Sequence, residues 1–221
     1  MSNVRPRVPP SRSPHSEILA AVGRSHLAPL GMQRRGRSRL WLKDNSWWLS
    51  LVEFQPSGWG TGSYLNVAAM WLWHPKDHFA FDECARVGGF VHFADAESFS
   101  TAASELGQLA ASETSKNLRK FSSVAQVAAH LTAAAAGNPW HHYHAMMAAL
   151  ALNDLVAAGA QQAALERIDH PASWCLDLKA KAQTVVQAAS HSMPQDVVYL
   201  EVQRARELLK LPSMSNVEVW A

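Results

Sequence analysis

Between residues 38 and 93 the chain alternates between apolar and polar positions at short intervals, as half-buried β-strands do. Four runs carry this pattern, at 38–43, 46–54, 63–73 and 85–93, and they are rich in Trp, Leu and Val. Short segments with Asp, Asn, Gly or Pro separate consecutive runs. Because short connections join antiparallel neighbours, we predict a four-stranded antiparallel meander.

On both sides of this region the apolar positions recur with a helical period. Ile18, Leu19, Val22 and Leu27 predict a short N-terminal helix, which ends before Gly31. Further helices are predicted at 98–112, 115–136, 139–158, 160–168, 172–190 and 194–210. Asn138 and Pro139 suit a helix start, and Gly159 suits a helix end. Helices segregated from an antiparallel sheet define an α+β fold.

The same pattern divides the chain into four parts. Residues 1–15 hold four prolines and three arginines with little to bury, so we expect a disordered basic arm. Residues 16–97 form the helix and the sheet, and residues 98–211 form a helical half packed on that sheet. Residues 212–221 are left as a tail.

The glycine-rich corner Gly58-Trp59-Gly60-Thr61-Gly62 raises the question of phosphate binding. Dinucleotide loops need G-x-G-x-x-G before a helix, and Walker A loops need a lysine after the last glycine. Here Ser63 follows, and 63–73 alternates like a strand, so the helix N-terminus that binds anions is missing. We therefore interpret the segment as the corner of a β-hairpin, in which glycine allows unusual backbone angles.

Pairing the strands across this corner predicts where a polar site would lie. Glu53 then faces Asn66, and Glu53, Gln55 and Asn66 form a polar cluster at the glycine-rich end of the sheet. The alternative is a polar fringe where the sheet meets water. Trp59 sits at the tip of the corner, where we expect it to be exposed and available to a partner.

Charge is distributed unevenly along the chain. The first 43 residues hold nine Lys and Arg against one acid, Glu17, whereas the remainder is acidic, and the whole chain carries a net charge of +2. Arg34, Arg35 and Arg37, with Arg39 beyond them, could therefore meet an acidic partner or nucleic acid. The alternative, which we favour over nucleic-acid binding, is that these arginines remain solvated.

Residues 31–73 hold several short motifs in order. They are Gly31-Met32-Gln33-Arg34-Arg35-Gly36-Arg37, then Trp47-Trp48, Glu53-Phe54-Gln55-Pro56-Ser57 and Tyr64-Leu65-Asn66-Val67. This series resembles an uncharacterised bacterial family of unknown function, whose pattern has a Gly-Phe-x-x-x-Gly-Arg element, a Trp-containing strand, an Asn-Phe-Gln-x-Ser segment, a short Gly/Ser corner and a Phe-x-Val-Asn strand. Met32 and Glu53 depart from the pattern. The resemblance covers residues 31–73 and implies an α+β fold but no activity.

The remaining histidines, cysteines and serines do not match a known metal-binding or catalytic motif. His141 and His144 share a helix face but are too few to hold a metal, and their proximity to His74 or His78 is left open. No nucleophile elbow is present, and the thiols of Cys84 and Cys175 are expected to be buried rather than bridged. We therefore predict no metal and no cofactor. With no apolar run of membrane-spanning length and no secretory signal, we expect a cytoplasmic protein that does not enter the membrane.

These observations favour a non-catalytic binding or regulatory module that contacts a protein partner, as small immunity proteins do. The contact residues would be Trp59 with Arg34, Arg35 and Arg37. Two alternatives stay open: an enzyme with its polar site at Glu53, Gln55 and Asn66, and a nucleic-acid binder that uses segment 34–39. The oligomeric state is not predicted.

Overall fold

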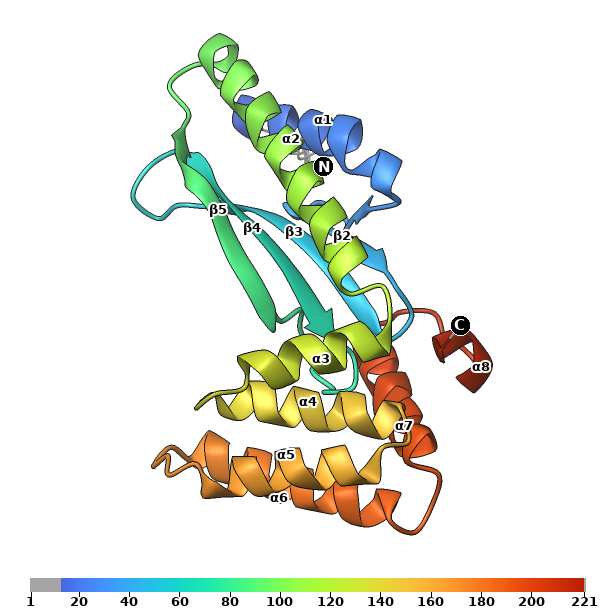
Figure 1. Cartoon of the computed structure of the whole chain (residues 1–221). Coiled ribbons are helices and arrows are strands. Elements are labelled where there is room, and N and C mark those ends of the chain that lie inside the picture. The colour runs from blue at the N-terminus through green and yellow to red at the C-terminus, as the bar shows by residue number, and fades with distance from the viewer. Residues whose placement is uncertain (1–12, 221) are drawn as a thin grey trace, which may run out of the picture. The chain divides into compact units, whose positions relative to one another are not determined.

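The computed structural model describes residues 13–220, and it confirms the α+β fold (Figure 1). The sheet has five antiparallel strands in the order β1-β2-β3-β4-β5, one more than predicted. The additional strand is the two-residue β1, in which Gln33 pairs with Leu42 and Arg34 with Trp41. The elements are α1 (Pro14–His26), the 3-10 turn η1 (Ala28–Leu30), β1 (Gln33–Arg34), β2 (Leu40–Asp44), β3 (Trp48–Pro56), β4 (Gly62–Trp71), β5 (Glu83–His92), α2 (Ala96–Lys120), α3 (Val124–Ala134), α4 (Pro139–Ala151), α5 (Leu155–Arg167), α6 (Ser173–Ala189), α7 (Pro194–Leu208) and α8 (Asn216–Trp220).

Several boundaries differ from the predicted ones for local reasons. The predicted arm at 1–15 falls mostly outside the described residues, and α1 begins at Pro14. Helix α2 runs on to Lys120, and α3 starts anew after Ser123, whose hydroxyl accepts a hydrogen bond from the Gln126 amide. The predicted helix end at Gly159 is wrong. Helix α4 ends at Ala151, Asn153 has a positive φ of 59°, and Asp154 caps α5, which contains Gly159.

The chain forms two compact units, and β3 and β4 contribute residues to both. Unit 1 comprises Met1–Leu42, Val52–Val67 and Ala85–Glu113, of which residues 13 onward are described. Its core joins α1, α2 and alternate residues of the strands. The members are Leu19, Val22, Leu27, Met32, Trp41, Val52, Phe54, Leu65, Val67, Phe99, Ala103, Leu106 and Ala110. Since strand side chains alternate between faces, the intervening positions of β3 and β4 point away from this core.

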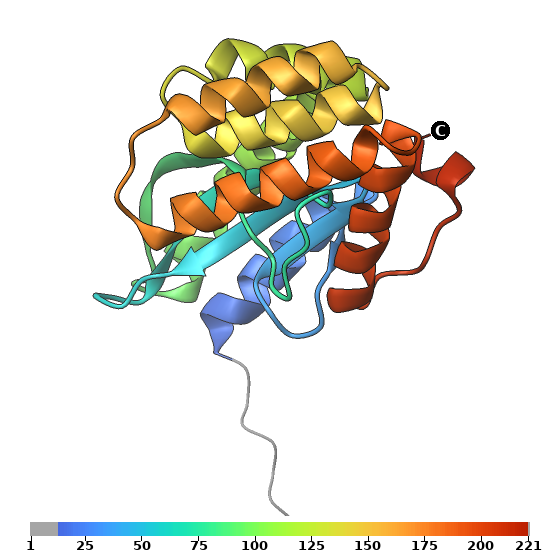
Figure 2. The ribbon, with the colours of Figure 1, turned by 90° about the horizontal axis from the view of Figure 1, so that it is seen from below.

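Unit 2 comprises Lys43–Leu51, Ala68–Cys84 and Thr114–Ala221. Three nearly parallel indoles lie where β3 begins and β4 ends. The Trp47 and Trp73 rings lie 5.3 Å apart at 8°, and those of Trp71 and Trp73 lie 5.6 Å apart at 17°. Phe121 meets Trp71 edge to face at 5.1 Å, a favourable aromatic arrangement. Among the helices, α4 contacts α3, α5, α6 and α7, which surround it in Figures 1 and 2. This explains why α4 is buried almost throughout.

An ion pair between a buried arginine and a more exposed aspartate joins distant segments of unit 2. Arg206 of α7, 1% exposed, donates two hydrogen bonds to the carboxylate of Asp44, at 3.0 and 2.6 Å. It also donates to the carbonyl oxygens of Ser46 and Pro212, each at 2.7 Å. The guanidinium is therefore well satisfied, as a buried charge requires.

Removing the Asp44 carboxylate should destabilise the protein, because the Arg206 charge would stay buried without its counterion. We expect Asp44→Ala to lower the free energy of unfolding by about 3 kcal/mol, measured by chemical denaturation. The control is Asp177→Ala, which removes an exposed carboxylate on α6. Equal midpoints for the two variants would contradict the role given to this pair.

Candidate functional site

The loop between β3 and β4 is held at its base and bare at its tip. The amide of Trp59 donates to the Ser57 hydroxyl at 3.0 Å, and the amide of Phe93 donates to the Thr61 carbonyl at 2.9 Å. The Trp59 side chain is 100% exposed. In Figures 1 and 2 the loop, coloured cyan, projects beyond the strands that it joins.

The three glycines of this corner differ in how closely other residues pack against them. A Cβ atom on Gly62 would overlap the Val91 carbonyl oxygen and the Phe90 ring, so β5 packs directly against its backbone. A Cβ atom on Gly58 or Gly60 would meet nothing within 4 Å. Only Gly62 is therefore required by close packing, while the other two leave the backbone of the loop open to solvent.

A pocket of about 620 Å³ lies beside the corner, lined by Ser13, His15, Arg39 and residues 56–62. It changes one conclusion drawn from the sequence. No helix follows the glycines in the chain, but the fold places the first turn of α1 beside them. His15 and Ser63 both contact Arg39, and the sequence analysis missed both. The reason is that His15 and Ser63 lie 48 positions apart in the chain.

The residues predicted as a polar cluster lie together on the face of the sheet away from the unit 1 core. Asn66 Nδ2 donates to Glu53 Oε2 at 3.3 Å and to Gln55 Oε1 at 3.0 Å. Arg86, which the sequence analysis missed, donates to Asn66 and Gln55 and stacks on Tyr64. Extending the strand pairing to 85–93 would have found it. These groups bind one another, so much of their hydrogen-bonding capacity is used.

The predicted arginine contacts lie around the turn between β1 and β2. Arg35 and Arg37 are exposed. Arg34 donates to the carbonyl oxygens of Ser38 and Arg37, at 2.6 and 3.0 Å. Arg34 therefore stabilises its own turn.

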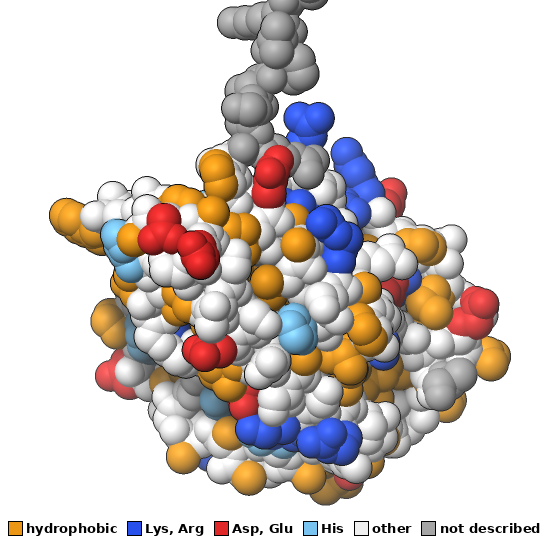
Figure 3. Space-filling view, turned by 90° about the horizontal axis from the view of Figure 1, so that it is seen from above, with side chains coloured by type: hydrophobic (Ala, Val, Ile, Leu, Met, Phe, Trp, Pro, Cys, Tyr) orange, Lys and Arg blue, Asp and Glu red, His pale blue; other side chains and the backbone are white. Residues whose placement is uncertain are grey.

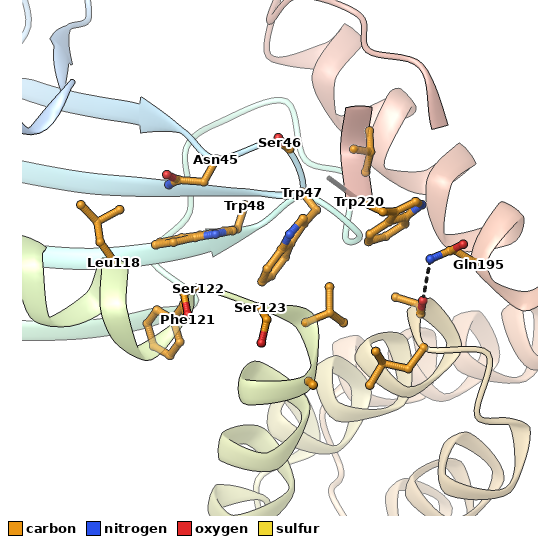
Figure 4. Close-up of a pocket in the computed structure, with 15 residues that line it drawn as sticks. Asn45, Ser46, Trp47, Trp48, Leu118, Phe121, Ser122, Ser123, Gln195 and Trp220 are labelled. Carbon is orange, nitrogen blue, oxygen red and sulfur yellow. Dashed lines mark hydrogen bonds between the residues drawn. The ribbon is translucent and has the colours of Figure 1, made fainter. Parts of the chain in front are cut away.

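A second pocket lies within unit 2, with a volume of about 470 Å³ (Figure 4). Trp47, Trp48, Phe121 and Trp220 supply aromatic walls, and Trp220 comes from the short helix α8. The indole N–H of Trp220 is buried, and no described residue accepts a hydrogen bond from it. Gln195 at the edge donates to the Ala151 carbonyl at 3.0 Å. Such walls suit a flat apolar group.

The sequence analysis did not predict whether His74 or His78 lies near His141 and His144; in the structure His74 lies close to His144. His74 lies 6.2 Å from His144, measured between ring centroids, and 5.0 Å from Trp140. Trp73 Nε1 donates to His144 Nδ1 at 3.1 Å. Burial lowers the pKa of His144 well below its usual value, so the ring is neutral with its proton on Nε2. His78 is apart from this group, exposed beside Asp77.

These histidines line or adjoin a small polar pocket of about 330 Å³. Its lining includes Lys76, Asp82, Trp140, His141 and His144. Lys76 pairs with Asp82, whose other oxygen accepts from the Trp71 amide. Within residues 13–220 no three His, Cys, Asp or Glu side chains are placed to hold a metal ion.

Two further expectations concern the thiols and the membrane. Cys175 is buried, but Cys84 is exposed, which corrects the prediction that both are buried; neither forms a disulfide. Cys84 lies on β5, most of whose residues are exposed or only partly buried. Across the described part of the chain, no helix is both long and apolar enough to cross a lipid bilayer.

Comparison with known proteins adds no family to this description. No protein-family model matches the chain, and neither curated proteins nor solved structures give a significant match. The resemblance of residues 31–73 to a bacterial family therefore stays a prediction.

The unequal roles of the corner glycines can be tested by a matched pair of variants. Gly62→Ala should lower the free energy of unfolding by roughly 1–3 kcal/mol, because its methyl group collides with the backbone of β5. Gly60→Ala should leave stability unchanged or slightly raised. Thermal or chemical denaturation measures both, and equal losses would contradict the assignment.

Acid should destabilise the protein through its buried neutral histidines. Burial, then His144, Lys76 and Lys181, lower the pKa of His74 to about 2. Below pH 6.5, His74 takes up a proton in the unfolded chain but not in the folded chain. The free energy of unfolding therefore falls as the pH falls from 6.5 towards 4. Each such histidine contributes about 1.4 kcal/mol per pH unit over this range.

His74→Phe should remove one histidine's share of this slope, seen in denaturation at pH 7, 5.5 and 4.5. At pH 7 it should not weaken the fold, because both ring nitrogens of His74 are buried without partners. His78→Phe alters an exposed ring and serves as the control. A slope identical to that of the wild-type chain would show that His74 does not resist protonation.

Proposed function

We propose that the protein is a non-catalytic binding module that recognises a partner protein through the loop between β3 and β4. The observation that carries this proposal is the fully exposed Trp59 side chain at the tip of that loop. An indole in this position adds nothing to the core, yet tryptophan is among the residues that contribute most to protein interfaces. Exposing this large apolar side chain to water is unfavourable, and contact with a partner would remove that cost.

The anchoring of the loop supports the same role. The bond from the Trp59 amide to Ser57 restrains the tip of the loop. At the base, Thr61 accepts from the Phe93 amide and Gly62 packs closely against β5. Because a restrained loop loses less conformational entropy on association, more of the contact energy is available for affinity. We expect the partner to offer an apolar cleft that receives the indole.

Charge indicates the chemistry around that cleft. The exposed Arg35 and Arg37 favour a partner whose surface is acidic, since complementary charge speeds association and selects partners. These two arginines need not contribute much affinity at the rim. Their role would be to select a partner whose contacting surface is negatively charged.

The two alternatives have weaker support and stay predictions. A nucleic-acid site needs a continuous basic surface, whereas Figure 3 shows Lys and Arg side chains in small groups among uncharged and acidic ones on the face drawn. An enzyme would need free polar groups, whereas Glu53, Gln55 and Asn66 are engaged with one another and with Arg86.

The proposal is tested with Trp59→Ala. The wild-type chain and the variant are used to isolate a stoichiometric partner, which is then purified and titrated against both. We expect the variant to bind at least thirtyfold more weakly, the size of an interface hot spot of about 2 kcal/mol, with no change in thermal stability.

Val156→Ala is the matched control, because Val156 is an exposed apolar residue on α5, 86% accessible. It should bind like the wild-type chain. A partner that binds the Trp59→Ala variant with unchanged affinity would exclude the loop as the contact surface.

A further inference from the structure

Within residues 13–220, no carboxylate neutralises the charge of Arg39. Its guanidinium contacts the hydroxyls of Ser63 and Ser16 at 3.3 and 3.2 Å, and His15 Nδ1 at 3.3 Å. All three partners are uncharged, and within residues 13–220 no acidic side chain forms an ion pair with it. Burial lowers the pKa of Arg39 without removing its proton under ordinary conditions. A partly desolvated cation without a counterion is costly to keep.

The groups that contact Arg39 accept its hydrogen bonds but carry no negative charge. Since arginine can only donate, His15 Nδ1 must accept, and the histidine proton sits on Nε2, which donates to Ser63 Oγ at 3.3 Å. Burial and then Arg39 lower the pKa of His15 to about 4, which keeps the ring neutral. Ser63, 0% exposed, thus receives two hydrogen bonds, and the described residues supply no acceptor for its own proton.

A cavity lies next to Arg39 and opens to solvent. Its wall includes Ser13, which starts α1 without using its side chain to cap the helix. The opposite wall is the corner 56–62, where Gly58 and Gly60 leave the backbone accessible. Helix starts and glycine-rich backbone both favour negative charge. The volume, about 620 Å³, admits a phosphate group together with the molecule that carries it.

We propose that this pocket binds a phosphate-type oxyanion, with Arg39 as its counterion and the glycine corner as its rim. The ligand supplies the negative charge that the described chain lacks around Arg39. The site goes beyond the binding of a protein partner, because its ligand binds in the absence of that partner. The phosphate group can belong to a small phosphate monoester or to a phosphorylated side chain.

The test is calorimetric titration of the full chain at constant ionic strength with inorganic phosphate, phenyl phosphate and a phosphoserine peptide. We expect saturable binding of one equivalent, with chloride as the inactive control. Binding that is at least tenfold tighter for phenyl phosphate than for the peptide identifies a small-molecule source. The reverse order identifies a protein-borne phosphate, and equal binding means that the site recognises the phosphate group alone.

Arg39→Gln should weaken phosphate binding at least tenfold, whereas Arg37→Gln, which removes an exposed charge from the neighbouring turn, should leave it unchanged. Because Arg39 also bonds to α1, Thr61→Glu gives a second test that does not remove those contacts. Its carboxylate, placed on the pocket wall, should neutralise Arg39 and abolish phosphate binding while thermal stability at low salt is kept or raised.

Partner binding is measured with the purified partner and Trp59→Ala, and the oxyanion site is measured with phosphate alone and Arg39→Gln, so failure of partner binding and failure of the oxyanion site are separable. Absence of phosphate binding by the wild-type chain overturns the proposal. Unchanged binding by either Arg39→Gln or Thr61→Glu also overturns it.

Discussion

The antiparallel pairing of β3 with β4 is the constraint on which the other features depend. Strand alternation sends Val52, Phe54, Leu65 and Val67 into the unit 1 core and leaves Glu53, Gln55 and Asn66 on the other face. A slip of one residue would exchange the two sets and bury a carboxylate. The same pairing fixes which residues form the connecting loop, and so determines that Trp59 lies at its tip.

Much of this arrangement follows from local pattern in the sequence. The alternation of 46–54 and 63–73 predicts both strands, and the pairing across the corner predicts that Glu53, Gln55 and Asn66 are close. Asn138 starts α4 as predicted, because a side-chain cap and a proline at the first position act within one turn. Local rules succeed where the interacting groups are neighbours in the chain.

The rest could not be predicted, because it depends on contacts between distant segments. Arg39, His15 and Ser63 meet only when α1 lies beside the strands, and no spacing in the sequence records this. The burial of Arg206 against Asp44, 162 positions away, is of the same kind. Gly159 misled for a different reason: a glycine ends a helix only where the backbone turns left-handed, and here Asn153 takes that conformation.

The open space around Gly58 and Gly60 has a consequence for how this protein can vary over evolutionary time. Substitutions at these two positions meet no packed neighbour, whereas Gly62 is fixed by β5. The tip of the loop can therefore change its sequence without disturbing the strand pairing beneath it. Divergence of the loop sequence is therefore separated from the requirement to fold, as it is for variable loops on other β-scaffolds.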